Sequence, residues 1–250
     1  MKYLLAFSLL GLAVPLRAEP ESTVERLLAS YDAVQSVQVE IRRDTAGPAG
    51  SGRRLSRVYF RRPDQLHVES VTPPRRRIVA DGTNFYSYIE GDPKGFSRPV
   101  AQLEGDWLTS LRQVPGTAMD HLLRLRGFPE EALPGTELFP TRIAIRRDER
   151  VAVLGLDAQG RLARFELFTD ASLATPIARY EYENFIEPIP GVWFATIQKA
   201  GLRQGREEAV ETTRLSNLQV NQLIPDPLFR HDTFFEGVAF TDNLDELYGP

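Results

Sequence analysis

The sequence predicts a mainly β protein in which about eleven strongly curved antiparallel strands form an unclosed barrel, capped by an N-terminal helix and a helical insertion. Most of the chain falls into short segments in which apolar and polar residues alternate, as they do in half-buried strands. The segments are joined by very short turns of Pro, Asp and Gly, which only antiparallel neighbours permit. So many strands in one sheet must curl or close, and the helices then need its concave face as an apolar partner.

Residues 1–18 have the composition of a cleavable secretory signal. Lys2 supplies a positive start, the run from Tyr3 to Leu16 is almost wholly apolar, and Ala18 is a small residue at the expected cleavage point. The apolar run is shorter than the roughly 20 residues that span a bilayer as a helix, although an uncleaved anchor is the alternative. We expect export to the periplasm and a single domain over residues 19–250.

The chain contains no Cys, which limits how its fold can be stabilised and how it can be attached to a membrane. A chain without Cys has no disulfide and no N-terminal Cys for lipid attachment, so we expect it not to be membrane-anchored itself. The formal net charge of −4 disfavours binding to nucleic acid, and no nucleic-acid partner is expected.

A helix is expected to begin at Ser22, because Ser22 and Glu25 have the spacing of a capping box. Apolar residues then recur at helical spacing up to Val34, which gives the helix one apolar face. From Val37 the period changes to two, and residues 46–52, rich in Gly, Pro and Ser, are expected to form a loop. The remaining strands are expected at residues 56–62, 65–71, 76–80, 85–89, 141–146, 151–156, 162–169, 177–185, 192–200, 207–220 and, as an open alternative, 231–235.

The alternation stops between Pro99 and Pro140, where two short helical patterns predict a helical insertion within the β protein. Its apolar residues are either ordinary core or a hydrophobic lid over a cavity that admits an acyl chain. The residues expected to line that lid are Leu103, Trp107, Leu111, Met119, Leu122 and Leu123.

The residue types of catalytic sites are thinly represented. The three His residues lie in different elements, and His67 with Glu69 on one face of a strand is too common a pair to predict a metal site. The basic run Arg75-Arg76-Arg77 has two interpretations. It is a solvated hairpin end, or it is a site that attracts anionic lipid head groups or an acidic partner. We therefore expect no catalytic residue, no metal and no cofactor.

Arg62 is the charged residue that we single out. Alternation along its strand places Val58, Phe60 and Arg62 on one face, which is expected to be the concave one. A guanidinium there needs acceptors, and backbone carbonyls at the end of a helical lid are suitable. The alternative is that Arg62 only extends to solvent at the strand end.

Three neighbouring segments form a distinctive set of motifs: Val58-Tyr59-Phe60-Arg61-Arg62-Pro63, Leu66-His67-Val68, and the segment from Ile78 through Asp81-Gly82 to Tyr88. These motifs resemble the LolA-like family of outer-membrane lipoprotein carriers. The run from Leu215 to Asn221 is similar to the ending of the wider group of lipoprotein-sorting proteins. The resemblance implies an unclosed barrel whose hydrophobic cavity receives acyl chains, and a lid held closed by the Arg before Pro, which is Arg62 here.

Two functions follow from these observations. The first is a periplasmic carrier that binds the acyl chains of a lipoprotein or lipid and shuttles it toward the outer membrane, with an inner-membrane exporter as donor and an outer-membrane acceptor. The second is a periplasmic regulator that senses envelope lipid or lipoprotein status by binding a membrane-protein partner. Val58, Phe60 and the insertion residues would line the cavity, and Arg62 would latch the lid.

Overall fold

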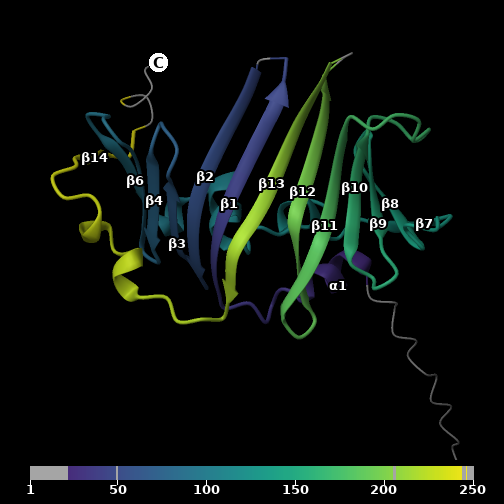
Figure 1. The fold of residues 1–250 in the computed structure, drawn as a ribbon, viewed down its shortest axis with the longest axis horizontal. Coiled ribbons are helices and arrows are strands. Elements are labelled where there is room, and N and C mark those ends of the chain that lie inside the picture. Colours follow the sequence, from purple (N-terminus) through teal and green to yellow (C-terminus); the bar gives the residue numbers. More distant parts are fainter. Residues whose placement is uncertain (1–21, 49, 205–206, 244–245, 247–250) are drawn as a thin grey trace, which may run out of the picture.

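The computed structural model describes residues 22–48, 50–204, 207–243 and 246 (Figure 1). The predicted signal at residues 1–18 lies outside the described residues, and so does the start of the predicted domain at residue 19. Within the part of the chain that is described, no helix is long and apolar enough to cross a membrane.

The strands form one 14-stranded sheet that is antiparallel except at one edge. Its order is β14-β6-β5-β4-β3-β2-β1-β13-β12-β11-β10-β9-β8-β7, so its two edges do not pair and the sheet stays open (Figure 1). The prediction of an unclosed, curved antiparallel sheet is confirmed. The strands are β1 (Ser36–Gly47), β2 (Gly50–Arg61), β3 (Gln65–Ser70), β4 (Arg76–Asp81), β5 (Asn84–Ile89), β6 (Gly95–Pro99), β7 (Glu130–Leu133), β8 (Thr141–Arg147), β9 (Arg150–Leu156), β10 (Leu162–Phe168), β11 (Ala178–Ile189), β12 (Val192–Gln204), β13 (Glu207–Val220) and β14 (Phe240–Thr241).

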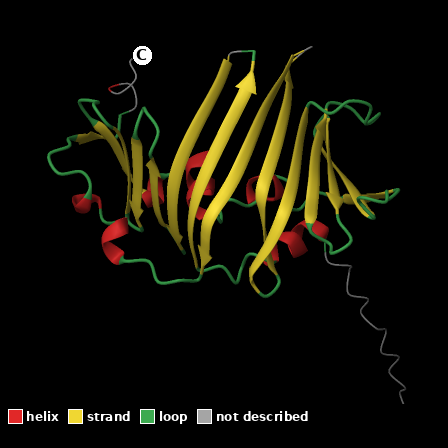
Figure 2. Ribbon diagram, in the orientation of Figure 1, coloured by secondary structure: helices red, strands yellow, loops and turns green. Residues whose placement is uncertain are grey.

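The helices are short and lie mostly on one side of the sheet. The N-terminal helix and the insertion supply α1 (Thr23–Ala29), α2 (Gly105–Arg112), α3 (Met119–Leu123) and the 3₁₀ helix η1 (Val100–Gln102). In Figure 2, α2 and α3 lie behind the central strands. Buried residues of α1, α2 and α3 share one apolar cluster with residues of the sheet, so these helices cover its concave face.

The strand count exceeds the prediction of about eleven because three strands carry weak sequence signals. Strand β6 contains Gly95 and Pro99, β7 is a short edge strand of helix-favouring residues, and β14 has only two residues. The first two are stabilised by pairing with β5 and β8, a tertiary context that overrides local preference.

The expected loop at residues 46–52 was wrong. Strand β1 pairs with β2 from Ser36↔Arg61 to Gly47↔Gly50, so the hairpin continues through the Gly- and Ser-rich residues to its tip. Backbone hydrogen bonds in a ladder need no particular side chain, which explains why this composition misled the prediction. The helix expected to continue to Val34 also ends earlier, at Ala29, and turns connect it to β1.

The C-terminal segment, residues 224–241, crosses the convex face of β3 to β5 and is called the C-terminal strap. Asp226 pairs with Arg61 across 2.8 Å, the guanidinium of Arg61 lies over the Phe229 ring, and that of Arg77 lies over the Phe234 ring. The strand suggested at residues 231–235 was therefore wrong. That segment contains the 3₁₀ helix η3 (His231–Thr233), and η2 (Asp226–Phe229) precedes it. Its aromatic side chains pack on the face of the sheet, and its backbone does not pair with a strand.

Candidate functional site

The insertion crosses the concave face of the sheet through the loop between α2 and α3, residues 113–118, which is called the crossing loop. The backbone of Gly116 has a φ of 78°, and its carbonyl accepts a hydrogen bond of 2.7 Å from Nε2 of Gln198 on β12. A β-carbon on Gly116 would lie 2.8 Å from Cδ1 of Leu215, so only glycine allows the crossing loop to approach the sheet this closely. The insertion is therefore seated directly on β12 and β13.

A first cavity lies between the crossing loop and strands β1 to β4, and is called the β1–β4 cavity. Its volume is about 540 Å³, which falls within the usual range of small-molecule sites. Its floor is apolar and is made of Ile41, Val58, Leu66, Val68 and Ile78. Its polar end is formed by Arg43, Arg54, Arg124 and Asp120. The cavity thus has an aliphatic floor and a mainly basic mouth.

A second cavity of about 250 Å³ lies on the other side of the crossing loop, against α1, and is called the α1 cavity. Leu27 and Tyr31 line it from the N-terminal segment, and Leu122 lines it from α3. The hydroxyl of Tyr31 donates to the carbonyl of Trp193 across 3.1 Å, and burial raises the pKa of Tyr31 to about 12. Gly116 and Thr117 line both this cavity and the β1–β4 cavity, so the crossing loop is the wall between them.

A third cavity of about 660 Å³ lies beyond α3, against β9 to β11, and is called the β9–β11 cavity. His121 is stacked on Phe165 with 4.6 Å between ring centroids and contacts Tyr180 at 4.2 Å. Burial lowers the pKa of His121, which favours its neutral form. Helix α3 therefore has a cavity on each side of it.

Several polar contacts, some exposed and some partly buried, tether the insertion to the rest of the chain. Gln198 holds the crossing loop, and Arg147 donates to the carbonyl of Arg124 just after α3 across 3.0 Å. At the two ends, Arg112 pairs with Asp64 across 2.9 Å, and both Nε and Nη2 of Arg126 donate to the Glu25 carboxylate. Exposed ion pairs contribute only about 0.2–1 kcal/mol each, so the Arg112–Asp64 and Arg126–Glu25 pairs can be exchanged at little cost.

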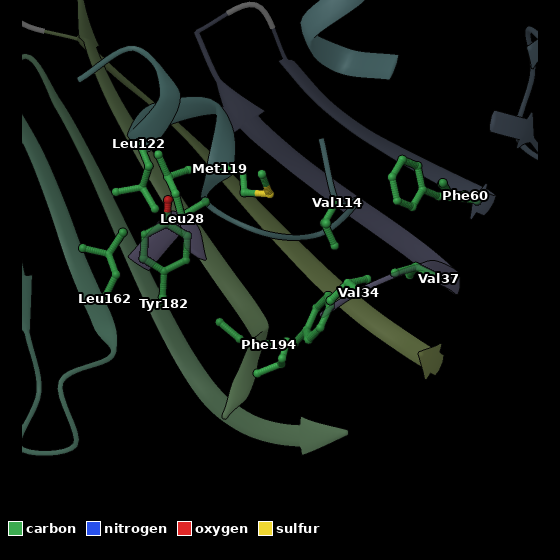
Figure 3. Close-up of a cluster of buried hydrophobic side chains, with 14 of the residues drawn as sticks. Leu28, Val34, Val37, Phe60, Val114, Met119, Leu122, Leu162, Tyr182 and Phe194 are labelled. Atoms are coloured by element: carbon green, nitrogen blue, oxygen red, sulfur yellow. The ribbon is translucent and has the colours of Figure 1, made fainter. Parts of the chain in front are cut away.

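Most of the residues expected to line the lid are buried in the core. Phe60 and Leu111 are 0% and 1% exposed, and Figure 3 shows Met119 and Leu122 with Leu28 of α1 on the sheet side of the insertion. Val58 lines the β1–β4 cavity and Leu122 the α1 cavity, while Leu103 is buried and Leu123 is partly buried. Trp107 is 41% exposed and meets the Phe85 ring edge to face.

Arg62 lies at the end of β2, where it contacts the turn that follows α1. Its Nε donates to the carbonyl of Val34 across 2.7 Å, and its Nη2 donates to the carbonyl of Tyr31 across 3.3 Å. The acceptors are backbone carbonyls at the end of a helical segment, but the segment is the N-terminal one and not the insertion. Tyr31 also lines the α1 cavity, so Arg62 is hydrogen-bonded to a residue of the cavity wall.

Glu130 has a structural role that the sequence analysis missed. Its carboxylate accepts hydrogen bonds from Ser22 Oγ at 2.6 Å and from the backbone N–H groups of Thr23 and Val24, both at 2.9 Å. Although burial raises the pKa of Glu130, these hydrogen bonds hold it below its usual value. The expected capping box is present only in part, since Ser22 accepts from the Glu25 backbone while the Glu25 side chain binds Arg126.

His67 is buried by the C-terminal strap, at 2% exposure, and its ring lies between those of Tyr59 and Phe234. Neither of its ring nitrogens has a hydrogen-bond partner in the part of the chain that the structure describes, and burial lowers the pKa of His67 to about 4. Among the described residues, no group of three or more His, Cys, Asp and Glu is placed to hold a metal ion.

Three solved bacterial structures with the same fold illustrate the similarity. A DUF1329 family protein from Desulfovibrio piger matches with a TM-score of 0.55 at 11% identity, covering 84% of this chain and 96% of that one. A LolA superfamily protein from Nitrosomonas europaea matches with a TM-score of 0.52 at 16% identity, over 84% and 96% of the two chains. An outer membrane lipoprotein-sorting protein domain from Vibrio parahaemolyticus matches with a TM-score of 0.54 at 11% identity, over 85% and 94%. The resemblance to a LolA-like fold is thereby confirmed.

No protein-family description matches the sequence, and no curated protein matches it.

Proposed function

We propose that this chain is a periplasmic carrier that binds the acyl chains of a lipoprotein or lipid beneath its insertion and shuttles the cargo toward the outer membrane without catalysis. The observation that carries the proposal is the crossing loop, which lies on the concave face as a wall between two cavities. The β1–β4 cavity has an aliphatic floor suited to an acyl chain, and lies under a segment that is held by apolar packing and by two partly exposed ion pairs.

The energetics of this arrangement suit reversible binding. An acyl chain gains about 0.8 kcal/mol for each CH₂ group that it buries. In the empty protein the same concave face is covered by Leu111, Met119 and Leu122 of the insertion, which are apolar groups of similar character. Cargo and insertion therefore compete for one surface, and this competition keeps the affinity low enough for release.

Arg62 would set the balance between the closed and open states. Its two hydrogen bonds fix the turn after α1 to the end of β2, and α1 in turn contacts the insertion through Glu25 and Arg126. Loss of the Arg62 bonds would loosen the wall of the α1 cavity first. In this proposal Arg62 is the latch of the empty carrier.

The comparisons support the proposal at the level of fold, because two of the similar structures are described as a LolA superfamily protein and a lipoprotein-sorting domain. The composition of residues 1–18 supports export, and the resemblance to outer-membrane lipoprotein carriers supports the periplasm as the destination. An inner-membrane exporter as donor and an outer-membrane acceptor complete the proposed route.

The experiment is acyl-lipid transfer between vesicles. Donor vesicles carry a pyrene-labelled phospholipid, acceptor vesicles carry none, and the purified chain is added between them. We expect transfer at a rate proportional to protein concentration, with the mass of the recovered lipid unchanged. Native mass spectrometry of protein exported to the periplasm is expected to show species with bound lipid.

The outcomes separate the alternatives. A chain that neither retains lipid in native mass spectra nor moves it between vesicles is not a carrier. Binding of lipid without transfer would favour the sensor, and a recovered lipid of altered mass would show catalysis.

A further inference from the structure

Two arginines face each other at the mouth of the β1–β4 cavity. Arg43 on β1 and Arg54 on β2 are direct partners in the strand register, and both line the cavity above its aliphatic floor. Direct partners in an antiparallel pair have side chains on the same face about 5 Å apart, where like charges destabilise the sheet. Two like charges therefore face each other at this position, and a neutral residue in place of either arginine would remove the repulsion.

The charges around this pair leave it largely uncompensated. The contact between Arg43 Nε and Glu211 Oε1 is long, at 3.8 Å, and among the described residues no carboxylate forms an ion pair with Arg54. Arg124, the third arginine at the mouth, pairs with Asp120 across 3.2 Å. The mouth therefore carries more positive than negative charge.

The convex face of the same hairpin shows the contrast. There Asp44 pairs with Arg42 at 3.0 Å, with Arg53 at 2.8 Å and with Arg214 at 2.9 Å, so one carboxylate serves three guanidinium groups. Arg42 and Arg53 on the convex face of this hairpin thus each have a carboxylate within 3.0 Å. On the cavity face Arg43 has one only at 3.8 Å, and Arg54 has none among the described residues.

We propose that the β1–β4 cavity selects an anionic amphiphile, whose carboxylate or phosphate lies between Arg43 and Arg54 while its acyl chain lies along Ile41, Val58 and Ile78. The inference rests on the proposed function, since it assigns the head-group chemistry of the same cargo site. Planar guanidinium groups bind carboxylate and phosphate through paired N–H donors, and an anion between them replaces repulsion by two attractions. A neutral or zwitterionic amphiphile would leave the two charges opposed.

The test compares two probes that share one chain, pyrene-labelled dodecanoic acid and its methyl ester, by fluorescence titration at neutral pH. We expect the protein to bind the acid about tenfold more tightly than the ester, the scale of one partly exposed charge-assisted contact. The R43Q/R54Q double variant is expected to lose this preference by weakening the acid and leaving the ester unchanged. The matched control is Arg53→Gln, next to Arg54 but on the convex face, which should keep the preference.

The outcomes distinguish this inference from the proposed function. Equal binding of acid and ester, unchanged in R43Q/R54Q, overturns the inference and leaves the carrier standing. Failure of both probes to bind, together with failure of lipid transfer, removes the carrier and the inference with it. Displacement of the acid by inorganic phosphate, at a phosphate concentration no higher than that of the acid, would show that the site binds free anions. That result would overturn the assignment of an amphiphilic ligand.

Discussion

Nε of Arg62 donates a hydrogen bond to the carbonyl oxygen of Val34 across 2.7 Å, which joins the end of β2 to the turn after α1. Substitution of Arg62 by Leu removes this bond and the one to Tyr31, and leaves two partly buried carbonyls without their donor. We expect a loss of about 1–3 kcal/mol in the free energy of unfolding and faster exchange of the amides of residues 30–35. Chemical denaturation and hydrogen exchange measure the two effects.

The latch role predicts a second effect of Arg62→Leu, namely slower release of bound acyl lipid, because the closed state that competes with the cargo is destabilised. Arg57→Leu is the matched control, because Arg57 lies on the convex face of the same strand and forms exposed ion pairs with Glu40 and Glu69. A release rate in Arg62→Leu equal to that of the control would limit Arg62 to a structural role.

Glu130→Gln tests the cap of α1. The amide has one oxygen and no charge, whereas the carboxylate accepts from three donors at the helix N-terminus. We expect a loss of about 1–2 kcal/mol in the free energy of unfolding at pH 7. Glu131→Gln is the control, because Glu131 is exposed and lies 3.8 Å from Arg146.

The pH dependence of this loss has a definite sign. Because the folded pKa of Glu130 is below its ordinary value of 4.5, its contribution is complete above that pH and disappears as the pH falls through the folded pKa. The difference in unfolding free energy between wild type and Glu130→Gln should therefore shrink below pH 4.5. A difference that persists undiminished at lower pH would assign the effect to packing.

The contrast between Arg62 and Glu130 shows how far the sequence predicts the site. Arg62 was identifiable because strand alternation is local, and alternation with Val58 and Phe60 selects its face. Glu130 was not, because its partners lie more than a hundred residues away in the chain and no local pattern encodes that proximity. The sheet as a whole was predictable because many short segments each show the alternation of apolar and polar residues independently.

The Arg43–Arg54 pair was missed for a different reason. A Gly- and Pro-rich stretch offers several positions for a hairpin tip, and moving the tip by one residue moves a side chain to the other face. Only the observed register, Arg43↔Arg54, brings the two charges together. The next predicted strand began only at residue 56, so Arg54 had no predicted place in a strand and no predicted partner.

Gly116→Ala tests the seat of the crossing loop. The added methyl group meets Leu215, which is buried, and the backbone φ of 78° disfavours any side chain. Gly127→Ala has nearly the same φ, 80°, with open space around its β-carbon, and isolates the backbone cost of about 1 kcal/mol. We expect Gly116→Ala to cost about 1–3 kcal/mol more than this control.

A double-mutant cycle completes the Gly116 experiment. In a Leu215→Ala background the methyl group has room, so the extra cost of Gly116→Ala should largely vanish. Equal costs in the two backgrounds would show that the contact with Leu215 does not hold the crossing loop.

His67→Phe tests the pH dependence of the C-terminal strap. In the unfolded chain His67 takes up a proton near its ordinary pKa of 6.5, whereas the folded protein resists protonation until about 4. The contribution of neutral His67 is therefore complete above pH 6.5 and is lost progressively as the pH falls to 4. The difference between a pKa of 6.5 and one of about 4 corresponds to roughly 3 kcal/mol in the free energy of unfolding.

Phenylalanine preserves the ring contacts with Tyr59 and Phe234 and removes the titrating group. The free energy of unfolding of His67→Phe, measured between pH 6.5 and 4, should fall less steeply than that of wild type. His121, whose pKa is also lowered by burial, contributes to the slope that remains, so H67F/H121F should be flatter again. Parallel curves for wild type and His67→Phe would mean that His67 is hydrated or protonated in the folded protein.

Ile78→Trp tests which cavity holds the acyl chain. Ile78 is only partly buried and belongs to the floor of the β1–β4 cavity, so the larger side chain can occupy the cavity without displacing the sheet. We expect it to weaken binding of a pyrene-labelled acyl chain at least about tenfold, because the ring fills the volume that the chain would bury. Leu27→Trp, which fills the α1 cavity in the same way, is the matched variant and should leave binding within about twofold of wild type. If Leu27→Trp blocks the chain and Ile78→Trp does not, the cargo lies against α1, and Arg62 then stands closer to it than the arginine pair does.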